Sequence, residues 1–217
     1  MTQVHVPQRL SESLKQATDT LHRDAERHPI QRALVTGQLD KPAYAVLLAQ
    51  LWLVHDALER AVRSEIESAS TTGRQIGRVW QPRLAHADQV RADLEFFHGS
   101  PTDPTPATAA LVGHIHDLAA TAPLGLLGML YVLEGSLNGG RYIAAALRKT
   151  YSLSDADGTR SLDPYGDRQP ALWKRWKQDL DDLGLKSDDR AIVIASAKTM
   201  FQALTAIFDD LHEPMPA

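Results

Sequence analysis

The sequence contains no cysteine among its 217 residues, and this absence excludes several kinds of chemistry. Without thiols the chain can form no disulfide, no thiolate-ligated metal centre, no iron–sulfur cluster and no cysteine nucleophile. It also lacks a basic surplus, since its formal net charge is -4, so we expect no nucleic-acid partner. A chain without cysteine fits the reducing cytoplasm, which is the location we expect.

Long apolar runs are missing as well. The N-terminus is polar and has no apolar segment of the length that a secretory signal needs. The most apolar stretch, residues 123–133, is followed by Glu134 and is too short to span a bilayer, so we expect no membrane partner. Hydrophobic residues make up 43% of the chain and charged residues 23%, the balance of a globular protein. We expect one domain over residues 1–217, with its core at about 10–211.

Apolar residues recur at helical spacing along nearly the whole chain, and no stretch shows the alternation typical of strands. The first apolar stripe begins at Leu10, with Ser11 as the expected N-cap, and ends at His28, because a residue before proline disfavours helix. Asp40 followed by Pro42 predicts the start of a long helix. Helices are expected at about residues 10–28, 30–35, 40–68, 83–97, 105–120, 123–150, 170–183 and 187–212, with the longest loop at 152–168. The sequence therefore predicts an all-α, single-domain multi-helix bundle.

Three glycines stand close together inside the helix predicted over residues 123–150. Gly135, Gly139 and Gly140 each cost roughly 1 kcal/mol relative to alanine in a helix interior. One interpretation is structural: the glycines let two helices pack closely, or the segment is a loop between helices. The other is that a flat ligand lies against bare backbone, at a kink that frees carbonyl groups for water or ligand. The spacing alone leaves both interpretations open.

His22 is the candidate metal ligand on the first predicted helix. Glu26 lies one turn further on, where its carboxylate can bond the second ring nitrogen and fix the tautomer of a metal-bound imidazole. The same spacing is typical of an ordinary surface pair, and a lone helical histidine is more often structural or exposed than a ligand. His55, on an apolar stripe, is interpreted as a core or lining residue.

Several segments, taken together, resemble the haem oxygenase family. Residues 14–26 (LKQATDTLHRDAE) resemble its proximal helix, with the pattern Leu-x-x-Ala-Thr-x-x-x-His-x-x-x-Glu. Residues 131–141 (YVLEGSLNGGR) resemble the distal helix of bacterial members, and residues 197–211 are similar to the last helix. Tyr165-Gly166 followed by Trp173 and Trp176 is similar to members linked to phytochromes. The resemblance covers about residues 10–211, with the landmarks in the expected order.

The resemblance implies a role for each matched residue. His22 would be the axial ligand of the haem iron as a neutral imidazole, with Glu26 as its partner. The residues that would lie over the distal face of the haem and act in catalysis are Gly135, Ser136, Asn138 and Gly139. The remaining haem-binding residues would be Gly140 and Tyr131 on the distal helix, the propionate-binding cations Lys15, Lys177 and Arg141, and the packing residues Phe201 and Phe208. For the two phenylalanines, plain core packing is an equal alternative.

The activity that the resemblance implies is oxidative cleavage of haem at a meso carbon. The products would be biliverdin, carbon monoxide and ferrous iron, with O2 as oxidant and haem as both substrate and cofactor. Electrons would come from an external donor such as a ferredoxin or a flavodoxin-type reductase. A bacteriophytochrome is a candidate acceptor of the biliverdin.

Two departures from the best-known members leave an alternative open. Ser136 stands where many members carry an aspartate that anchors distal water, so Ser136 or Asn138 would have to hold that water. Asp19 stands where some members have a second propionate-binding lysine. The alternative is a haem-binding protein for sensing or delivery that does not degrade its ligand. Thiamin-degrading enzymes with similar helical bundles need a nucleophilic cysteine, which this chain lacks.

Overall fold

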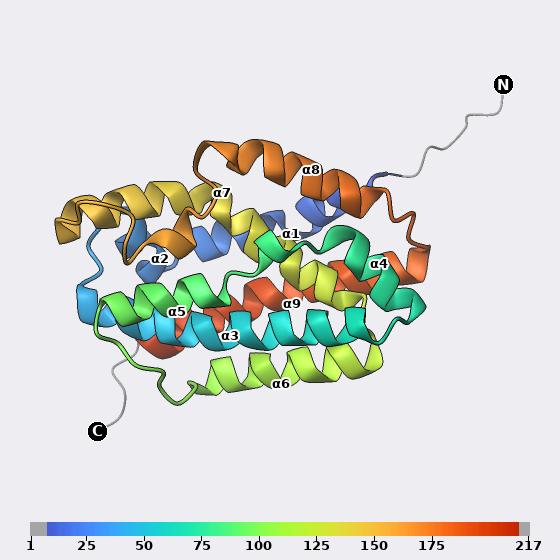
Figure 1. The fold of residues 1–217 in the computed structure, drawn as a ribbon, viewed down its shortest axis with the longest axis horizontal. Helices are drawn as coiled ribbons and strands as arrows, with labels where there is room; N and C mark the ends of the chain where they lie inside the picture. The colour runs from blue at the N-terminus through green and yellow to red at the C-terminus, as the bar shows by residue number, and fades with distance from the viewer. Residues whose placement is uncertain (1–7, 213–217) are drawn as a thin grey trace.

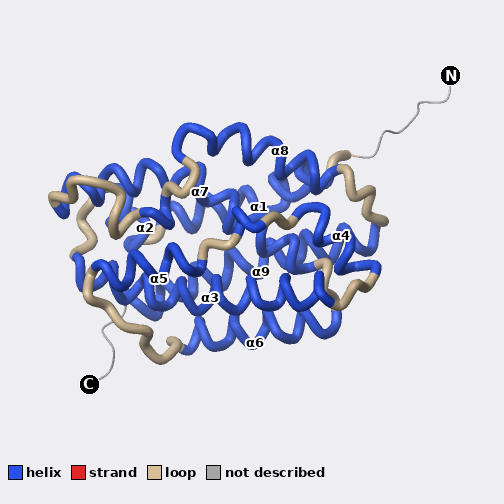
Figure 2. Tube along the Cα trace, viewed as in Figure 1, coloured by secondary structure: helices blue, strands red, loops and turns tan. Residues whose placement is uncertain are grey.

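The computed structural model describes residues 8–212 and contains, within that range, nine α-helices, three short 3-10 helices and no strand. The α-helices are α1 (Leu10–Arg27), α2 (Pro29–Val35), α3 (Lys41–Glu67), α4 (Thr71–Val79), α5 (Ala87–Phe96), α6 (Pro106–Thr121), α7 (Gly125–Tyr151), α8 (Gln169–Asp181) and α9 (Ser187–His212). Figures 1 and 2 show them as an elongated bundle in which the long helices lie roughly side by side. The all-α class is confirmed. The expected range 1–217 extends beyond the described residues at both ends, and the first residues of the polar N-terminus lie outside them.

Side-chain caps set several helix boundaries. The Asp40 carboxylate accepts the Ala43 N–H at 2.8 Å and begins α3, with Pro42 in its first turn. His28 ends α1 in extended backbone, as its place before Pro29 predicted, and its Nδ1 accepts the Ile30 N–H at the start of α2. The expected cap at Ser11 was wrong, because Ser11 lies inside α1.

The amide and hydroxyl of Ser11 both donate to the Asp181 carboxylate, at 2.8 and 2.7 Å. Asp181 is the last residue of α8, so this pair of hydrogen bonds ties the start of α1 to the end of α8. The contact joins residues far apart in the sequence, and no local capping pattern could reveal it.

The core forms where α9 packs along α7, with α1 and α6 also against α9. Gly125 and Gly128 bring α7 close to α9, because a Cβ at Gly128 would overlap the Val193 carbonyl oxygen. By length and composition α9 could cross a membrane. In this structure 33% of its apolar window is buried, and the buried part includes Val193 and Met200.

α7 remains helical through residues 135–140, so the interpretation of this segment as a loop was wrong. Figure 1 shows the helix changing direction partway along its length. The helix ends at Ser152, which adopts a left-handed conformation with φ 56°.

Two regions carry more structure than the sequence predicted. α4 was not expected, although Ser70 caps it by accepting the Gly73 N–H at 2.8 Å. The predicted loop 152–168 contains two 3-10 turns, at Arg160–Leu162 and Gly166–Arg168. The buried Asp93 carboxylate of α5 orders the first turn by accepting the amides of Arg160 and Ser161 and the Ser161 hydroxyl, at 2.7 to 3.0 Å.

Candidate functional site

His22 lies on the surface of α1, with 54% of its side chain exposed. Its Nδ1 is 3.6 Å from Glu26 Oε2, which is too long for a hydrogen bond but close enough for a modest shift to form one. Phe201 of α9 lies edge-on to the imidazole, with the ring centroids 5.7 Å apart. The structure therefore brings His22, Glu26 and Phe201 together, and the imidazole is exposed.

α1 and α7 pack against the same neighbouring helices. Both pack against α9, α8 and α2, whereas among the described residues they have little direct backbone contact with each other. An imidazole on one helix and a glycine surface on the other can thus be fixed by the same core without the two helices closing together.

The three glycines of α7 face different surroundings. A Cβ at Gly140 would overlap the Leu162 carbonyl oxygen, so close packing against the 152–168 loop is sufficient to explain this glycine. A Cβ at Gly135 would touch the Trp173 ring at 3.5 Å, an ordinary van der Waals contact. A Cβ at Gly139 would meet nothing within 4 Å. Helical Gly139 therefore costs about 1 kcal/mol relative to alanine, and no packing within the described chain explains it.

Ser136 and Asn138 direct their donors back onto α7. The Ser136 hydroxyl donates to the Leu133 carbonyl at 2.7 Å, and the Asn138 amide donates to the Gly135 carbonyl at 2.8 Å. Their oxygens still have lone pairs that can accept a hydrogen bond from water. Ser136 is exposed and Asn138 is half-buried.

An aromatic cluster joins α7 to α8 beside Gly135. Tyr131 is buried with its ring 5.3 Å from Trp173 and 6.2 Å from Trp176, and the two indoles stack with an interplanar angle of 18°. Burial raises the pKa of Tyr131 to about 12, so its phenol stays protonated. The Trp173 ring is the group that lies against Gly135, a role in the site that the sequence did not predict.

The three predicted propionate-binding cations have different surroundings. Lys177 lies over the Trp173 ring, with Nζ 5.2 Å from the centroid, and Lys15 is exposed on α1. Arg141 donates to Asp167 at 3.0 Å, so its guanidinium already has an anionic partner. Phe208 packs near the other end of α1, with its ring 5.4 Å from His28.

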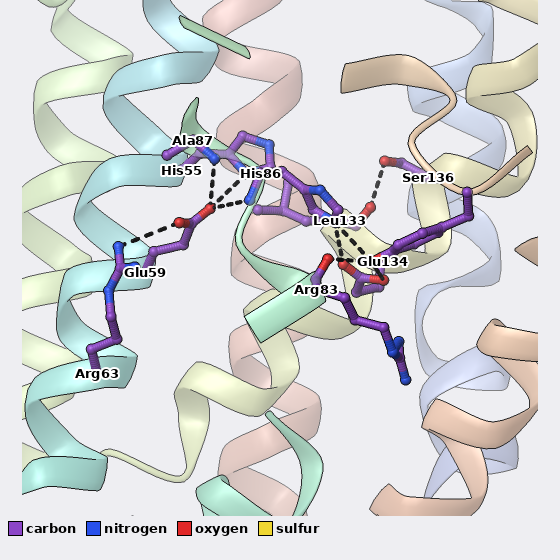
Figure 3. A network of polar contacts seen from close by, with 10 residues as sticks. His55, Glu59, Arg63, Arg83, His86, Ala87, Leu133, Glu134 and Ser136 are labelled. Carbon is purple, nitrogen blue, oxygen red and sulfur yellow. Dashed lines mark hydrogen bonds and ion pairs between the residues drawn. The ribbon is translucent and has the colours of Figure 1, made fainter. Parts of the chain in front are cut away.

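Figure 3 shows a buried polar network between α7 and α3 that the sequence did not predict. His86 Nε2 lies 2.9 Å from Glu134 Oε1 and 3.1 Å from the Tyr165 hydroxyl. On α3, Glu59 accepts the backbone N–H of His86 at 2.7 Å, and His55 lies 3.8 Å from Glu59. The His55 side chain is 15% exposed and thus mostly buried beside Glu59. A signal was present: Glu134 directly follows the most apolar stretch of the chain.

The comparisons with known proteins agree with this architecture. The family model described as "Heme oxygenase" matches residues 8–210. The heme oxygenase of Rhodella violacea is 25% identical over 209 residues, covering 94% of this chain and 87% of the relative. Human heme oxygenase 1 is 27% identical over 216 residues, covering 96% and 73%. This all-helical bundle has the fold of the haem oxygenases. Because the family model matches residues 8–210, the chain belongs to the haem oxygenase family.

Solved structures share the fold. Heme oxygenase-2 from Synechocystis sp. PCC 6803, in complex with heme and NO, matches with a TM-score of 0.86 at 22% identity, covering 94% of this chain and 85% of that one. The heme oxygenase from Leptospira interrogans matches with a TM-score of 0.84 at 23% identity, covering 93% and 98%. A TenA homologue from Pyrococcus furiosus has a lower TM-score, 0.66 at 12% identity.

Proposed function

We propose that this chain is a haem oxygenase that binds haem as its substrate between α1 and α7. The reaction is oxidative cleavage at a meso carbon to biliverdin, carbon monoxide and ferrous iron, with O2 and an external electron donor. The observation that carries the proposal is an exposed imidazole at His22 of α1 together with an exposed position without a side chain, Gly139, on α7, two helices that the same neighbours hold in place. Membership of the haem oxygenase family supports the same conclusion.

The residues present fit haem. His22 offers an exposed imidazole, and neutral imidazole is an ordinary axial ligand of haem iron. Glu26 is within reach of Nδ1 and can orient the ring once Nε2 binds iron. Phe201 beside His22 supplies an apolar edge that suits a porphyrin.

The contribution of the chain to the reaction is mainly positional. Bound haem supplies the iron that activates oxygen. Gly139, without a side chain, lets α7 approach a flat ligand closely and so limits where a reacting atom can sit above it. Ser136 and Asn138 present acceptor oxygens for an ordered water on that helix.

Cations at the edge of the site would bind the two propionates. Lys177 and Lys15 are the proposed partners, and Arg141 is a weaker candidate because it already bonds Asp167. Asp19, which replaces a lysine of some relatives, pairs with Arg23 at 2.8 Å on the surface of α1. This pair accounts for Asp19 locally and removes one expected cation from the propionate grip.

The proposal is tested by adding haem to the purified protein and then supplying ascorbate or a ferredoxin system as reductant. We expect the Soret band to disappear while the absorbance of biliverdin rises. A haem complex that binds stoichiometrically but keeps its Soret band under reductant would instead identify a haem-sensing or delivery protein, the function that Ser136 left open.

A steric variant tests the role of Gly139. Gly139→Leu would fill the open space over α7, so we expect haem to bind more weakly and turnover to fall at least tenfold. Turnover at the wild-type rate would contradict the close approach of α7 to the haem.

Partners and location complete the proposal. We propose a ferredoxin or flavodoxin-type reductase as electron donor, a bacteriophytochrome as a candidate recipient of biliverdin, and the cytoplasm as location. The absence of cysteine supports the last point, because it fits a reducing compartment.

A further inference from the structure

The carboxylate of Glu134 is buried directly before the glycine segment of α7. Its side chain is 6% exposed, and the His86 imidazole that it bonds is 4% exposed. Tyr165, from the loop after α7, completes the group with its hydroxyl 3.4 Å from Glu134 Oε2 and 3.1 Å from His86 Nε2. Figure 3 shows the polar atoms of His86 and Glu134 directed toward one another.

The hydrogen bonds fix where the protons lie. The Tyr165 hydroxyl is 2.8 Å from the Arg83 carbonyl oxygen, which can only accept, so the phenol donates there. The phenol oxygen and the Glu134 carboxylate then both need a donor, and His86 Nε2–H is the group that faces them. Burial, together with the charge on Glu134, raises the pKa of Tyr165 well above its usual value, so the phenol keeps its proton.

His86 is therefore the Nε2–H tautomer, and its Nδ1 is buried without a hydrogen-bond partner among the described residues. In this tautomer the single N–H of His86 faces the two acceptors, and no second buried N–H is left without an acceptor. A neutral imidazole beside an ionised carboxylate leaves the pair with one net negative charge.

Glu59, the other buried carboxylate near the His86–Glu134 pair, already has partners of its own. Glu59 accepts the backbone N–H groups of His86 and Ala87 at 2.7 and 2.8 Å, with Arg63 at 3.5 Å and His55 at 3.8 Å. These contacts outweigh burial and lower the pKa of Glu59.

No comparable cation reaches Glu134. The Arg83 guanidinium donates to Gln81, and the neighbour from α8 is the uncharged Gln169, which lies 3.5 Å from the Glu134 carbonyl. Over residues 8–212, His86 is the one basic side chain within ion-pair distance of the Glu134 carboxylate.

We propose that Glu134 holds a buried negative charge behind the glycine segment of α7, and that this charge sets the proton affinity of water on the haem-facing side. Glu134 would thereby replace, from a buried position one helical turn before Asn138, the carboxylate that is missing at Ser136. It is a positioning residue: His86 and Tyr165 hold it, and it acts on the water through its electric field. The inference rests on the proposed function, because the water in question is bound to haem beside α7.

The magnitude of the effect follows from Coulomb's law. A separation of about 10 Å is the scale of one helix with its side chains. A unit charge at that distance, with an effective dielectric constant of about 20, shifts a titration by roughly one pH unit. Removing a negative charge favours hydroxide over water, so the midpoint of the water titration must fall.

The test is an optical pH titration of the water bound to the ferric haem complex. We expect Glu134→Gln to lower the midpoint by about one pH unit relative to the wild type. Tyr165→Phe removes a hydrogen bond but no charge, so its midpoint should stay close to that of the wild type. Glu134→Asp keeps a negative charge, so its midpoint should lie close to that of the wild type.

Asp93→Asn is the matched control. Asp93 is also a buried carboxylate and also orders the 152–168 loop, through Arg160 and Ser161, but it lies on α5 rather than beside the glycine segment. We expect it to lower stability without moving the midpoint. Equal shifts in Asp93→Asn, Tyr165→Phe and Glu134→Gln would overturn the proposal in favour of general loosening of the loop, as would no shift in Glu134→Gln.

A second measurement needs no haem. Nitrogen-15 NMR of labelled histidines in the apoprotein should report His86 as the Nε2–H tautomer at neutral pH, and Glu134→Gln should change its Nε2 signal. A doubly protonated or Nδ1–H His86 would remove the net charge on which the inference depends. If haem fails to bind, the proposed function fails while this measurement still decides the state of the buried pair.

Discussion

Gly140 of α7 lies against the backbone carbonyl of Leu162, so closely that no side chain fits between the helix and the 3-10 turn. The neighbouring Gly139 has open space in the direction of its missing Cβ. Two adjacent glycines thus have different surroundings: Gly140 packs the helix against the chain, and Gly139 is the position that we propose leaves room for haem.

This difference predicts opposite effects of the same substitution. Gly140→Ala should destabilise the apoprotein by about 1–3 kcal/mol, because the new methyl group forces the helix and the turn apart. Gly139→Ala should leave stability unchanged or raise it by up to about 1 kcal/mol, because alanine favours helix. Urea unfolding of the two variants measures both values, and a comparable loss in each would show that Gly139 is also packed.

His22→Ala should separate haem ligation from folding. The imidazole is 54% exposed, so the apoprotein should keep its unfolding free energy within about 0.5 kcal/mol. Haem affinity should fall at least tenfold, and the visible spectrum should lose the signature of imidazole ligation. His116→Ala, an exposed histidine of α6, is the control and should change neither property. An unchanged spectrum in His22→Ala would refute the ligand assignment.

Asp181→Ala should weaken the connection between α1 and α8. The carboxylate accepts two hydrogen bonds from Ser11, so its loss should cost about 1–3 kcal/mol of unfolding free energy. Because α1 carries His22 and α8 carries Lys177, haem affinity should fall as well. Asp182→Ala removes only an exposed contact with Gln178 and should have little effect on either quantity. Equal losses in the two variants would show that helix-end charge, rather than the tie to Ser11, is responsible.

The two buried carboxylates of α3 and α5 should respond to pH with opposite sign. Burial alone would raise the pKa of Glu59, but the nearby His55 imidazole and hydrogen bonds from the amides of Ala87 and His86 lower it below 4.5. Its stabilising contribution is therefore complete above that value and is lost as pH falls through the lowered pKa. For Asp93 burial dominates and raises the pKa above 3.8, so ionisation of this group reduces stability as pH increases.

Urea unfolding between pH 3 and pH 7 tests this pair, with both pH limits chosen to bracket roughly the usual range of carboxyl titration. Glu59→Gln should flatten the loss of stability at acid pH. Asp93→Asn should remove the opposing slope, though it also sacrifices part of the bonding to Ser161. A steeper acid loss in Glu59→Gln than in the wild type would contradict the lowered pKa.

The sequence itself predicted the all-α class, most helix positions and the pairing of His22 with Glu26. These features depend on local periodicity, on caps such as Asp40 and on the effect of Pro29 on His28, all of which act within a turn or two of helix. The family resemblance likewise depended on short patterns, and the family model confirms it.

Only the tertiary structure decided what each glycine and each buried charge does. Leu162 lies against Gly140, Asp181 bonds Ser11, and His86 meets Glu134 because distant segments pack together, and no periodic pattern encodes such contacts. The energies that settle these pairings come from excluded volume and from desolvated hydrogen bonds, which exist only once the bundle has closed. Local sequence thus determined where helices form and where His22 stands on α1. Packing determined which of the glycines of α7 is covered and which carboxylates are buried.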